Sequence, residues 1–282
     1  SEGRVLVCET IGILQPMLGD VTNAEFVASM GADMILLNMF DVNHPVIQGL
    51  PKTEDREVIR KIKQLTGRPV GINLEPLEQG KESSVETNEM WKLSGGRVAT
   101  LENAKTAVEM GVDFIVLTGN PGIGVTNAAI TDTLKLYREH LGEQVVLIAG
   151  KMHASGILSE CGEHILTEAD VRAFAEAGAD IILLPAPGTV PGITMEYVRS
   201  LVVCAHSLGK MTLTAIGTSQ EGADTDTIKE IALMCKMTGT DLHHLGDAGY
   251  GGKGLPENIL EYGKEIRGIR HTYHRMAVSI RR

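Results

Sequence analysis

Five side chains that can transfer protons or attack a carbonyl carbon stand at the ends of short apolar runs. Glu9, Glu75 and Lys151 each come directly after such a run. His153 lies two residues beyond Lys151, and Asp247 follows the last run. A carboxyl group transfers protons when its surroundings bring its pKa near the working pH, and a partly desolvated lysine can form a Schiff base or stabilise an enolate. We therefore expect a catalytic set with Lys151 at its centre and Glu9 or Glu75 as its proton-transfer partner.

A second set of residues can bind an anionic group. Thr218 and Ser219 supply hydroxyl donors after the seventh apolar run, and glycine-rich loops free backbone N–H groups that hold phosphate. Phosphate groups in closed barrels often bind at the loops after strands seven and eight. The residues that we predict to bind the anionic part of a substrate are Asn38, Gly217, Thr218, Ser219, Gly249, Gly251 and Gly252, with Lys253 nearby.

The loop Gly119–Gly124 competes for this role because it carries three glycines just before a predicted helix. Glycines are also what tight turns use, so this loop alone is a weak indication of a phosphate site. It follows the fourth strand, across the barrel from the eighth, and one phosphate therefore cannot contact both places. We prefer the loops after strands seven and eight, because two adjacent loops supply donors from more directions than one.

The elements that must position these residues are visible in a repeated stretch, in which Gly-x-Asp is followed by a short apolar run. The copies begin at Gly31, Gly111, Gly178 and Gly239, about 60 to 80 residues apart. Each glycine allows the left-handed conformation that ends a helix, and each unbroken apolar run predicts a strand buried on both faces. Because each interval has room for two strand–helix units, the copies predict the even-numbered strands.

The odd-numbered strands are predicted at Arg4–Thr10, Pro69–Leu74, Val145–Lys151 and Met211–Ile216. Eight strands that alternate with helices in 282 residues predict an α/β fold, a single (β/α)8 TIM barrel that forms one domain. The main competitor is an open doubly wound sheet. Its first strand is followed by a glycine fingerprint that Glu9–Leu14 lacks.

The role of Lys151 depends on the direction of its side chain. If Leu147, Ala149 and Lys151 point into the barrel, then Val146 and Ile148 face the helices, where apolar residues belong. We expect this arrangement. The alternative is that Lys151 pairs with one of the two glutamates as a structural ion pair that orders the barrel mouth.

Strands seven and eight also carry polar residues with a predicted direction. Thr212 and Thr214 alternate with apolar residues, and we expect them to line the barrel interior. His243 and His244 must point to opposite faces, with His244 inward by analogy with the other copies. A buried, hydrogen-bonded structural histidine is the main interpretation of His244, and a catalytic histidine is the alternative.

More than twenty residues, 76–98, separate the third strand from the next helix and include the single tryptophan, Trp91. Loops of this length inside a compact fold are usually functional lids or insertions. We predict a long loop after strand three that acts as a lid, with a small structural lobe as the alternative. Thr100 is the predicted N-cap of the helix Leu101–Met110 that follows.

Composition restricts the partners of the protein. The net charge of −10 argues against a nucleic-acid or anionic-membrane partner, since either would need a concentrated basic face. The chain has no apolar run near 18 residues and no signal peptide, which predicts a cytoplasmic location. We expect a small anionic metabolite as the partner and leave a homo-oligomer open.

Cysteines and histidines give no clear metal motif. Cys8, Cys161, Cys204 and Cys235 have neither disulfide-like nor zinc-like regularity. Cys161 and His164 have a spacing that some metal sites use, but no obvious second pair accompanies them. We therefore assign no metal ligand. The cofactor is left unknown, with a divalent metal as one possibility, and no motif indicates a nucleotide cofactor.

Four stretches carry a resemblance to a known family, namely Val5–Glu9, Gly31–Asn38, Ala149–His153 and Gly246–Gly249. Together they resemble an uncharacterised bacterial TIM-barrel family that is often labelled haloacid-dehalogenase-like or phosphoenolpyruvate-phosphonomutase-like. The resemblance spans the whole chain and implies the barrel fold. It implies no particular activity.

This sequence lacks the catalytic motifs of the two enzyme groups that give the family its labels. A haloacid dehalogenase needs an aspartate nucleophile after an apolar strand, whereas the nearest match, Asp224–Ile228, opens a predicted helix. The phosphonomutase and isocitrate-lyase group carries a Lys-Cys-Gly-His loop, and Cys161–His164 is not that sequence. The latter likeness is one of fold. Amidohydrolase barrels are excluded because Cys8–Thr10 lacks their His-x-His pair.

These observations predict an enzyme that acts on a small phosphorylated or carboxylated sugar-like metabolite at the carboxyl-terminal mouth of the barrel. A carbon–carbon lyase of the aldolase type or an isomerase suits the residues best. The alternative is a metabolite-binding or regulatory barrel without chemistry, because the sequence holds no complete catalytic motif.

Overall fold

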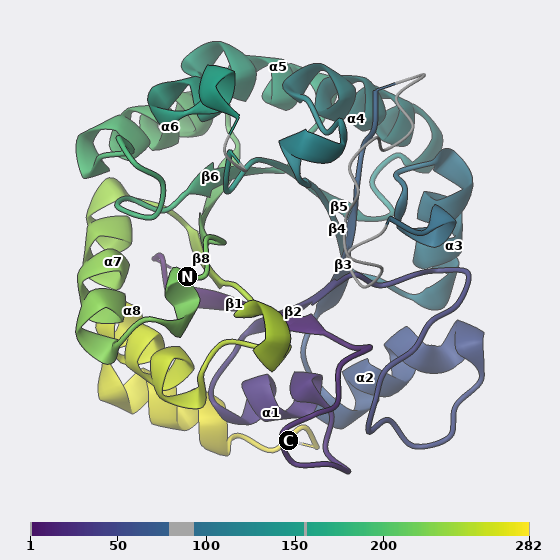
Figure 1. Cartoon of the computed structure of the whole chain (residues 1–282). Coiled ribbons are helices and arrows are strands. Elements are labelled where there is room, and N and C mark those ends of the chain that lie inside the picture. Colours follow the sequence, from purple (N-terminus) through teal and green to yellow (C-terminus); the bar gives the residue numbers. More distant parts are fainter. Residues whose placement is uncertain (1, 79–92, 155–156, 282) are drawn as a thin grey trace.

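A computed structural model of the chain describes residues 2–78, 93–154 and 157–281. Its eight parallel strands pair in chain order and close into a barrel, which Figure 1 shows from one end of its axis. The strands are β1 Val5–Ile11, β2 Met34–Asn38, β3 Val70–Leu74, β4 Phe114–Leu117, β5 Val146–Gly150, β6 Ile181–Pro185, β7 Met211–Ile216 and β8 Leu242–Leu245. The predicted α/β TIM barrel is confirmed.

Helices surround the barrel and alternate with the strands (Figure 1). They are α1 Asn23–Ser29, α2 Val58–Thr66, α3 Leu101–Met110, α4 Asn127–Leu141, α5 Glu168–Ala177, α6 Met195–Ser207, α7 Thr225–Thr238 and α8 Pro256–Ala277. Thr100 caps α3 as predicted, since its side chain accepts the backbone N–H of Asn103. Asp224 likewise caps α7, in agreement with a helix-opening role for that aspartate.

The repeated Gly-x-Asp stretch is a structural brace. In all four copies, the aspartate carboxylate accepts a hydrogen bond from a backbone N–H near the start of the preceding odd-numbered strand. The pairs, each 2.8 Å apart, are Asp33 with Leu6, Asp113 with Val70, Asp180 with Leu147 and Asp241 with Thr212.

Each of these carboxylates also contacts a basic side chain. The partners, in the same order, are Arg267, Lys63, Arg138 and His206. Every brace ties the turn that ends one helix to the start of the neighbouring strand. It therefore lies at the amino-terminal end of the barrel, where residues serve stability rather than chemistry.

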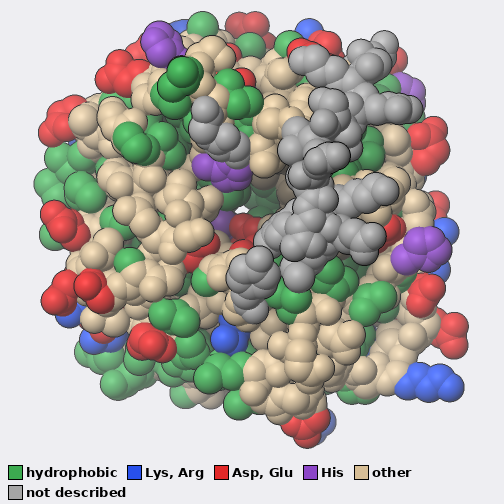
Figure 2. Space-filling view, viewed as in Figure 1, with side chains coloured by type: hydrophobic (Ala, Val, Ile, Leu, Met, Phe, Trp, Pro, Cys, Tyr) green, Lys and Arg blue, Asp and Glu red, His purple; other side chains and the backbone are tan. Residues whose placement is uncertain are grey.

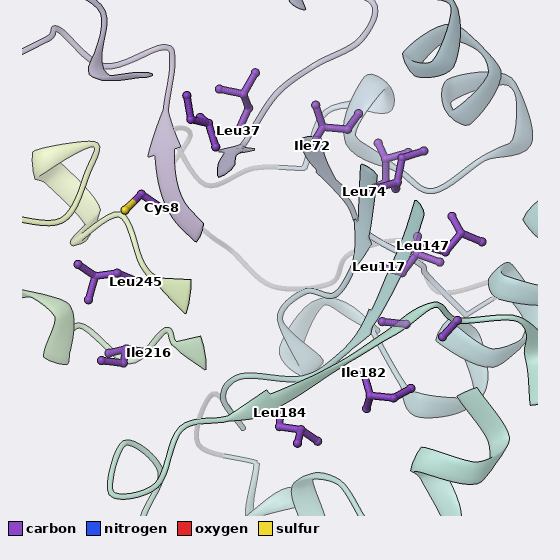
Figure 3. Packing of buried hydrophobic residues seen from close by; sticks show 14 of the residues in the cluster. Cys8, Leu37, Ile72, Leu74, Leu117, Leu147, Ile182, Leu184, Ile216 and Leu245 are labelled. Carbon is purple, nitrogen blue, oxygen red and sulfur yellow. The ribbon is translucent and has the colours of Figure 1, made fainter. Parts of the chain in front are cut away.

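Two apolar layers pack on the two faces of the barrel. The outer layer fills the space under the helices, and Figure 3 shows members of it, such as Cys8, Leu37 and Leu245, pointing away from the barrel axis. The inner layer fills the barrel itself and consists of Val7, Leu36, Phe114, Val116, Ile148, Met152, Ile181, Leu183, Leu213, Ala215 and Leu242.

The predicted direction of the β5 side chains is wrong. Ile148 belongs to the inner layer, whereas Leu147 and Ala149 belong to the outer one. Lys151 therefore continues the outward set. Residues 145–149 are all apolar, so the strand shows no alternation from which its faces could be read.

The direction predicted for β7 is also wrong, whereas that for β8 is confirmed. Leu213 faces inward. Thr212 faces outward, where its hydroxyl lies 3.2 Å from that of Thr240 and 3.2 Å from the carboxylate of Asp241. The outer face of this strand can therefore hold polar residues. In β8, the outward His243 contacts Tyr262 of α8 at 3.1 Å, and His244 points inward.

The predicted lid lies largely outside the described residues, because 79–92, including Trp91, are not among them. Within the part of the chain that is described, no helix has the length and apolar character needed to cross a membrane.

Candidate functional site

The carboxyl-terminal mouth of the barrel contains a cavity of about 600 Å³. Figure 2 shows a hollow in the middle of this face, with acidic and histidine side chains at its edge. Its volume is typical of sites that bind small molecules. The polar and charged residues that line it are Glu9, Asn38, Asn73, Glu75, Arg97, Thr118, Asn120, His153, Ser219, Glu221 and Asp247.

Three buried carboxyl groups gather on one wall of this cavity. Glu9 lies in the second half of β1 and points into the barrel, Asp247 follows β8, and Glu221 lies in the short 3₁₀ helix η7, Gln220–Gly222, after β7. Their exposed fractions are 6%, 9% and 4%. Strand order makes β1, β7 and β8 neighbours in the closed barrel, and this adjacency brings the three groups together.

The surroundings of these groups favour bound protons. Burial raises the pKa of Glu9 to about 7, and the nearby Glu221 adds to the effect. Burial also raises the pKa of Asp247 to about 7, with the adjacent Glu9 as the next cause. The pKa of Glu221 is raised by its burial as well. Near neutral pH this wall can therefore both accept and donate protons.

Backbone and amide donors fix the orientation of the carboxyl groups. Asn38 donates from its side-chain nitrogen to Asp247 at 3.0 Å, and the N–H of Gly249 donates to the other oxygen at 2.7 Å. The N–H of Ala248 donates to Glu221 at 3.2 Å. The second oxygen of Glu221 is buried and has no hydrogen-bond partner within the described ranges.

Three non-glycine residues beside this wall adopt the left-handed backbone conformation. Met39, Ser219 and Ala248 have φ values of 56°, 69° and 55°. Met39 follows Asn38, which donates a hydrogen bond to Asp247. Ser219 is the N-cap of η7, which contains Glu221, and Ala248 follows Asp247. Such conformations are costly outside glycine and cluster at functional sites, which supports this wall as the centre of the site.

The opposite wall contains a buried ion pair. Arg97, in the 3₁₀ helix η3 Gly95–Arg97, donates to Glu75 at 2.5 Å, and the backbone of Glu75 pairs with that of Val98. Burial raises the pKa of Glu75 even though Arg97 opposes the effect. Thr118 and Asn120, after β4, complete this wall. It is therefore less acidic than the wall with the three carboxyl groups.

Lys151 lies elsewhere, which corrects its predicted central place. Its side chain is 1% exposed, its Nζ lies 2.6 Å from Glu160, and it is not among the residues that line the cavity. Lys151 does form an ion pair, as the alternative interpretation expected, but its partner is Glu160 rather than Glu9 or Glu75. The cause is the outward direction of Lys151.

His153 lines the cavity as expected from its place after β5. Burial lowers its pKa, and the charge of Lys151 lowers it further, so the ring is neutral near pH 7. His153 is therefore suited to exchange hydrogen bonds with a bound ligand rather than to attract it by charge.

The residues predicted to bind an anion divide into two groups. Asn38, Gly217, Ser219 and Gly249 line the cavity, whereas Thr218, Gly251 and Gly252 do not. The carbonyl of Gly252 accepts the N–H of Ile11, and Lys253 is buried with its Nζ 4.9 Å from the centre of the Phe26 ring. The competing loop contributes Gly119, Asn120 and Ile123 to the cavity.

Sequence reasoning missed Arg97, Glu221, Asn73 and Thr118 as residues of the site. Asn73 and Thr118 stand at inward positions near the ends of β3 and β4, so the rule that sites lie at strand ends could have found them. Arg97 and Glu221 lie in short loop helices. Their sequence surroundings gave no signal of a place in the site.

Within the described ranges, no three His, Cys, Asp or Glu side chains are arranged to hold a metal ion. Cys161 is exposed, and Cys8, Cys204 and Cys235 are buried and unpaired by disulfides.

The closed barrel of eight parallel strands that alternate with helices places the chain among the TIM-barrel proteins. It belongs to the family described as "Domain of unknown function (DUF7916)", whose profile matches residues 1–282. No curated protein matches the chain at a significant level.

Two solved structures are similar in fold. Thiamine phosphate pyrophosphorylase from Pyrococcus furiosus is 14% identical with a TM-score of 0.51, and the match covers 95% of this chain and 98% of that one. A 2,3-dimethylmalate lyase, a member of the PEP mutase/isocitrate lyase superfamily, is 16% identical with a TM-score of 0.52 and coverage of 89% and 78%. At this identity the likeness shows the fold alone. It agrees with the phosphonomutase-like label as to fold, and nothing found supports the haloacid-dehalogenase-like label.

Proposed function

We propose that the protein is an enzyme that transfers protons on a small carbonyl compound bearing a carboxylate or phosphate, in a lyase or isomerase reaction. Glu9 and Asp247 are the proton-transfer pair. The observation that carries this proposal is that both carboxyl groups line one cavity, lie within hydrogen-bonding reach of each other, and have pKa values raised to about 7. Such a pair can remove a proton next to a carbonyl and return one to the product.

The anionic part of the substrate lies toward Arg97, Thr118 and Asn120 in this proposal. Glu221 and Asp247 border the loops after β7 and β8, and in their ionised form they repel phosphate there. This orientation reverses the one expected from the glycine-rich loops alone. A lyase among the proteins of similar fold is consistent with the proposal but is not evidence for it.

A metabolite-binding barrel without chemistry is the second candidate. It is favoured by the ion pair between Lys151 and Glu160, which leaves the lining of the cavity without that amine as a nucleophile.

Deuterium exchange separates the two candidates. The protein is incubated in D2O with a panel of 2-oxo acids and sugar phosphates, and loss of the C–H signals next to the carbonyl is followed by proton NMR. We expect wild-type protein to exchange the hydrogens of at least one compound and Glu9→Gln to lose this exchange. Glu176→Gln, the same substitution at an exposed site, is the matched control for Glu9→Gln. A compound that raises the melting temperature but never exchanges supports the binding barrel instead.

A further inference from the structure

A buried histidine lies directly beneath Glu9. In the parallel register His244 pairs with Val7 of β1 and Ala215 of β7, both residues of the inner apolar layer. Glu9 is two residues further along β1 and faces the same way. His244 is 0% exposed and is not among the lining residues of the cavity, so it can act on a substrate only through its neighbour.

The contact between these two side chains requires a proton. Nε2 of His244 lies 2.7 Å from Oε2 of Glu9. Two atoms that both accept hydrogen bonds repel at that distance, so one of them must carry the hydrogen. The distance is short enough for a hydrogen bond, but the direction from Nε2 to Oε2 is not aligned for one. Within the described residues, neither ring nitrogen of His244 has a partner with hydrogen-bond geometry. Catalytic hydrogen bonds of this kind often align only when substrate binds.

The surroundings decide where the hydrogen resides. Burial lowers the pKa of His244 to about 4, so the ring is neutral and carries one N–H near pH 7. Three carboxyl groups lie near the His244 ring, namely Glu9 on β1, Glu221 on η7 and Asp247 after β8. Nδ1 has no acceptor within the described part of the chain. A hydrogen on Nε2 lies next to Oε2 of Glu9 at 2.7 Å, whereas one on Nδ1 is buried with no acceptor nearby.

We propose that His244 is a positioning residue whose Nε2–H holds Oε2 of Glu9, so that Oε1 is the oxygen that exchanges a proton with the substrate. This inference rests on the proposed function for its catalytic meaning, and the contact itself is independent of any substrate. Glu9 as a carboxylate takes the substrate proton on Oε1 and becomes a neutral acid. It returns that proton in the second half of the reaction, while the ring keeps its own hydrogen throughout.

The same N–H sets the pH at which Glu9 acts. A hydrogen bond donated to a carboxylate favours the charged form and lowers the pKa, which opposes the effect of burial. Loss of the donor therefore raises the pKa of Glu9, and proton abstraction then begins at higher pH.

Two substitutions distinguish this role from simple packing. His244→Gln keeps an N–H that can reach the position of Nε2, whereas His244→Leu fills similar space without a donor. His243→Gln is the matched control, because His243 is the neighbouring buried histidine of β8 but contacts Tyr262 and the carbonyl of Gly3 on the outer face.

The first readout is the titration of Glu9 in substrate-free protein, followed by carbon-13 NMR of glutamate-labelled samples and assigned with Glu9→Gln. We expect His244→Leu to raise the midpoint by about one pH unit, and His244→Gln and His243→Gln to leave it nearly unchanged. A midpoint that is unmoved in His244→Leu, or moved equally by Leu and Gln, overturns the inference.

The second readout needs no variant at this position. Nitrogen-15 NMR of histidine-labelled wild-type protein shows which ring nitrogen of His244 is protonated, so it decides the matter even when His244→Leu does not fold. The Nε2–H form is expected, and the Nδ1–H form contradicts the inference. Both readouts use protein without substrate, and they therefore stand or fall separately from the deuterium exchange that tests the proposed function.

Discussion

The side-chain nitrogen of Asn38 donates a hydrogen bond to Asp247 across 3.0 Å, which joins the end of β2 to the loop after β8 over the barrel mouth. The oxygen of the same amide accepts the N–H of Met39 at 2.8 Å. Asn38 is thereby held in one orientation. Because a donor favours the charged form of a carboxylate, Asn38 opposes the burial that raises the pKa of Asp247.

Replacement of Asn38 by alanine removes this donor. We expect Asn38→Ala to raise the pKa of Asp247 by about one unit and to slow proton exchange about tenfold near pH 7. The pH dependence of deuterium exchange with an active compound measures both effects. The control is Gln144→Ala at an exposed site. An unchanged pH profile in Asn38→Ala would show that this contact does not tune Asp247.

The buried carboxyl groups make stability depend on pH with a defined sign. The pKa of Glu9 is about 7 in the folded protein and near 4.5 in the unfolded chain, so its protonated form favours folding. That contribution is complete below pH 4.5 and is lost as the pH rises through 7. It amounts to at most about 3 kcal/mol for this one group.

Urea unfolding at pH 5 and pH 8 tests this sign. We expect Glu9→Gln to be more stable than the wild type at pH 8 and to differ little from it at pH 5, because the amide cannot ionise. Equal losses of stability at both pH values would mean that Glu9 is not a buried, readily protonated acid.

Lys151 is expected to contribute to stability rather than to proton transfer. In Lys151→Met the remaining Glu160 side chain is 22% exposed and therefore still partly hydrated. We expect this variant to lose about 1 kcal/mol of unfolding free energy. Glu160→Gln leaves the 1% exposed ammonium unpaired and costs about 3 kcal/mol. Chemical unfolding of both variants shows the asymmetry. Loss of deuterium exchange in a well-folded Lys151→Met protein would restore the lysine to the catalytic centre.

We predict that substitution of the repeated aspartates lowers the stability of the protein without affecting proton exchange. Asp180→Asn weakens the hydrogen bond to the backbone of Leu147 and the contact with Arg138, and we expect it to lower the unfolding free energy by about 2 kcal/mol. Proton exchange by the folded fraction should remain at the wild-type rate. A variant with normal stability and reduced exchange would contradict the assignment of these residues to the brace.

Much of the fold could be predicted because the chain repeats its local signals. Each of the glycines Gly31, Gly111, Gly178 and Gly239 marks a helix end, and an apolar run of strand length follows each one. The direction of side chains within a strand was harder to predict. The run from Val145 to Ala149 is apolar at every position, because both faces of the strand are covered, and such a strand carries no period of two.

The site could be predicted only in part. Glu9, Glu75 and Asp247 were found because strands end at the mouth of every barrel of this kind. Arg97 and Glu221 enter the site from 3₁₀ helices in loops, whose path depends on tertiary contacts such as the pairing of Glu75 with Val98. Periodicity in the sequence carries no information about such paths.

The most direct test of the proton-transfer pair is the rate of deuterium incorporation into an active compound at neutral pD by wild type, Glu9→Gln and Asp247→Asn. Each variant keeps the size of its side chain and loses the ability to accept a proton. We expect both to exchange at least about a hundred times more slowly than wild type while they still bind the compound. Exchange at the wild-type rate in both folded variants would contradict the assignment of Glu9 and Asp247.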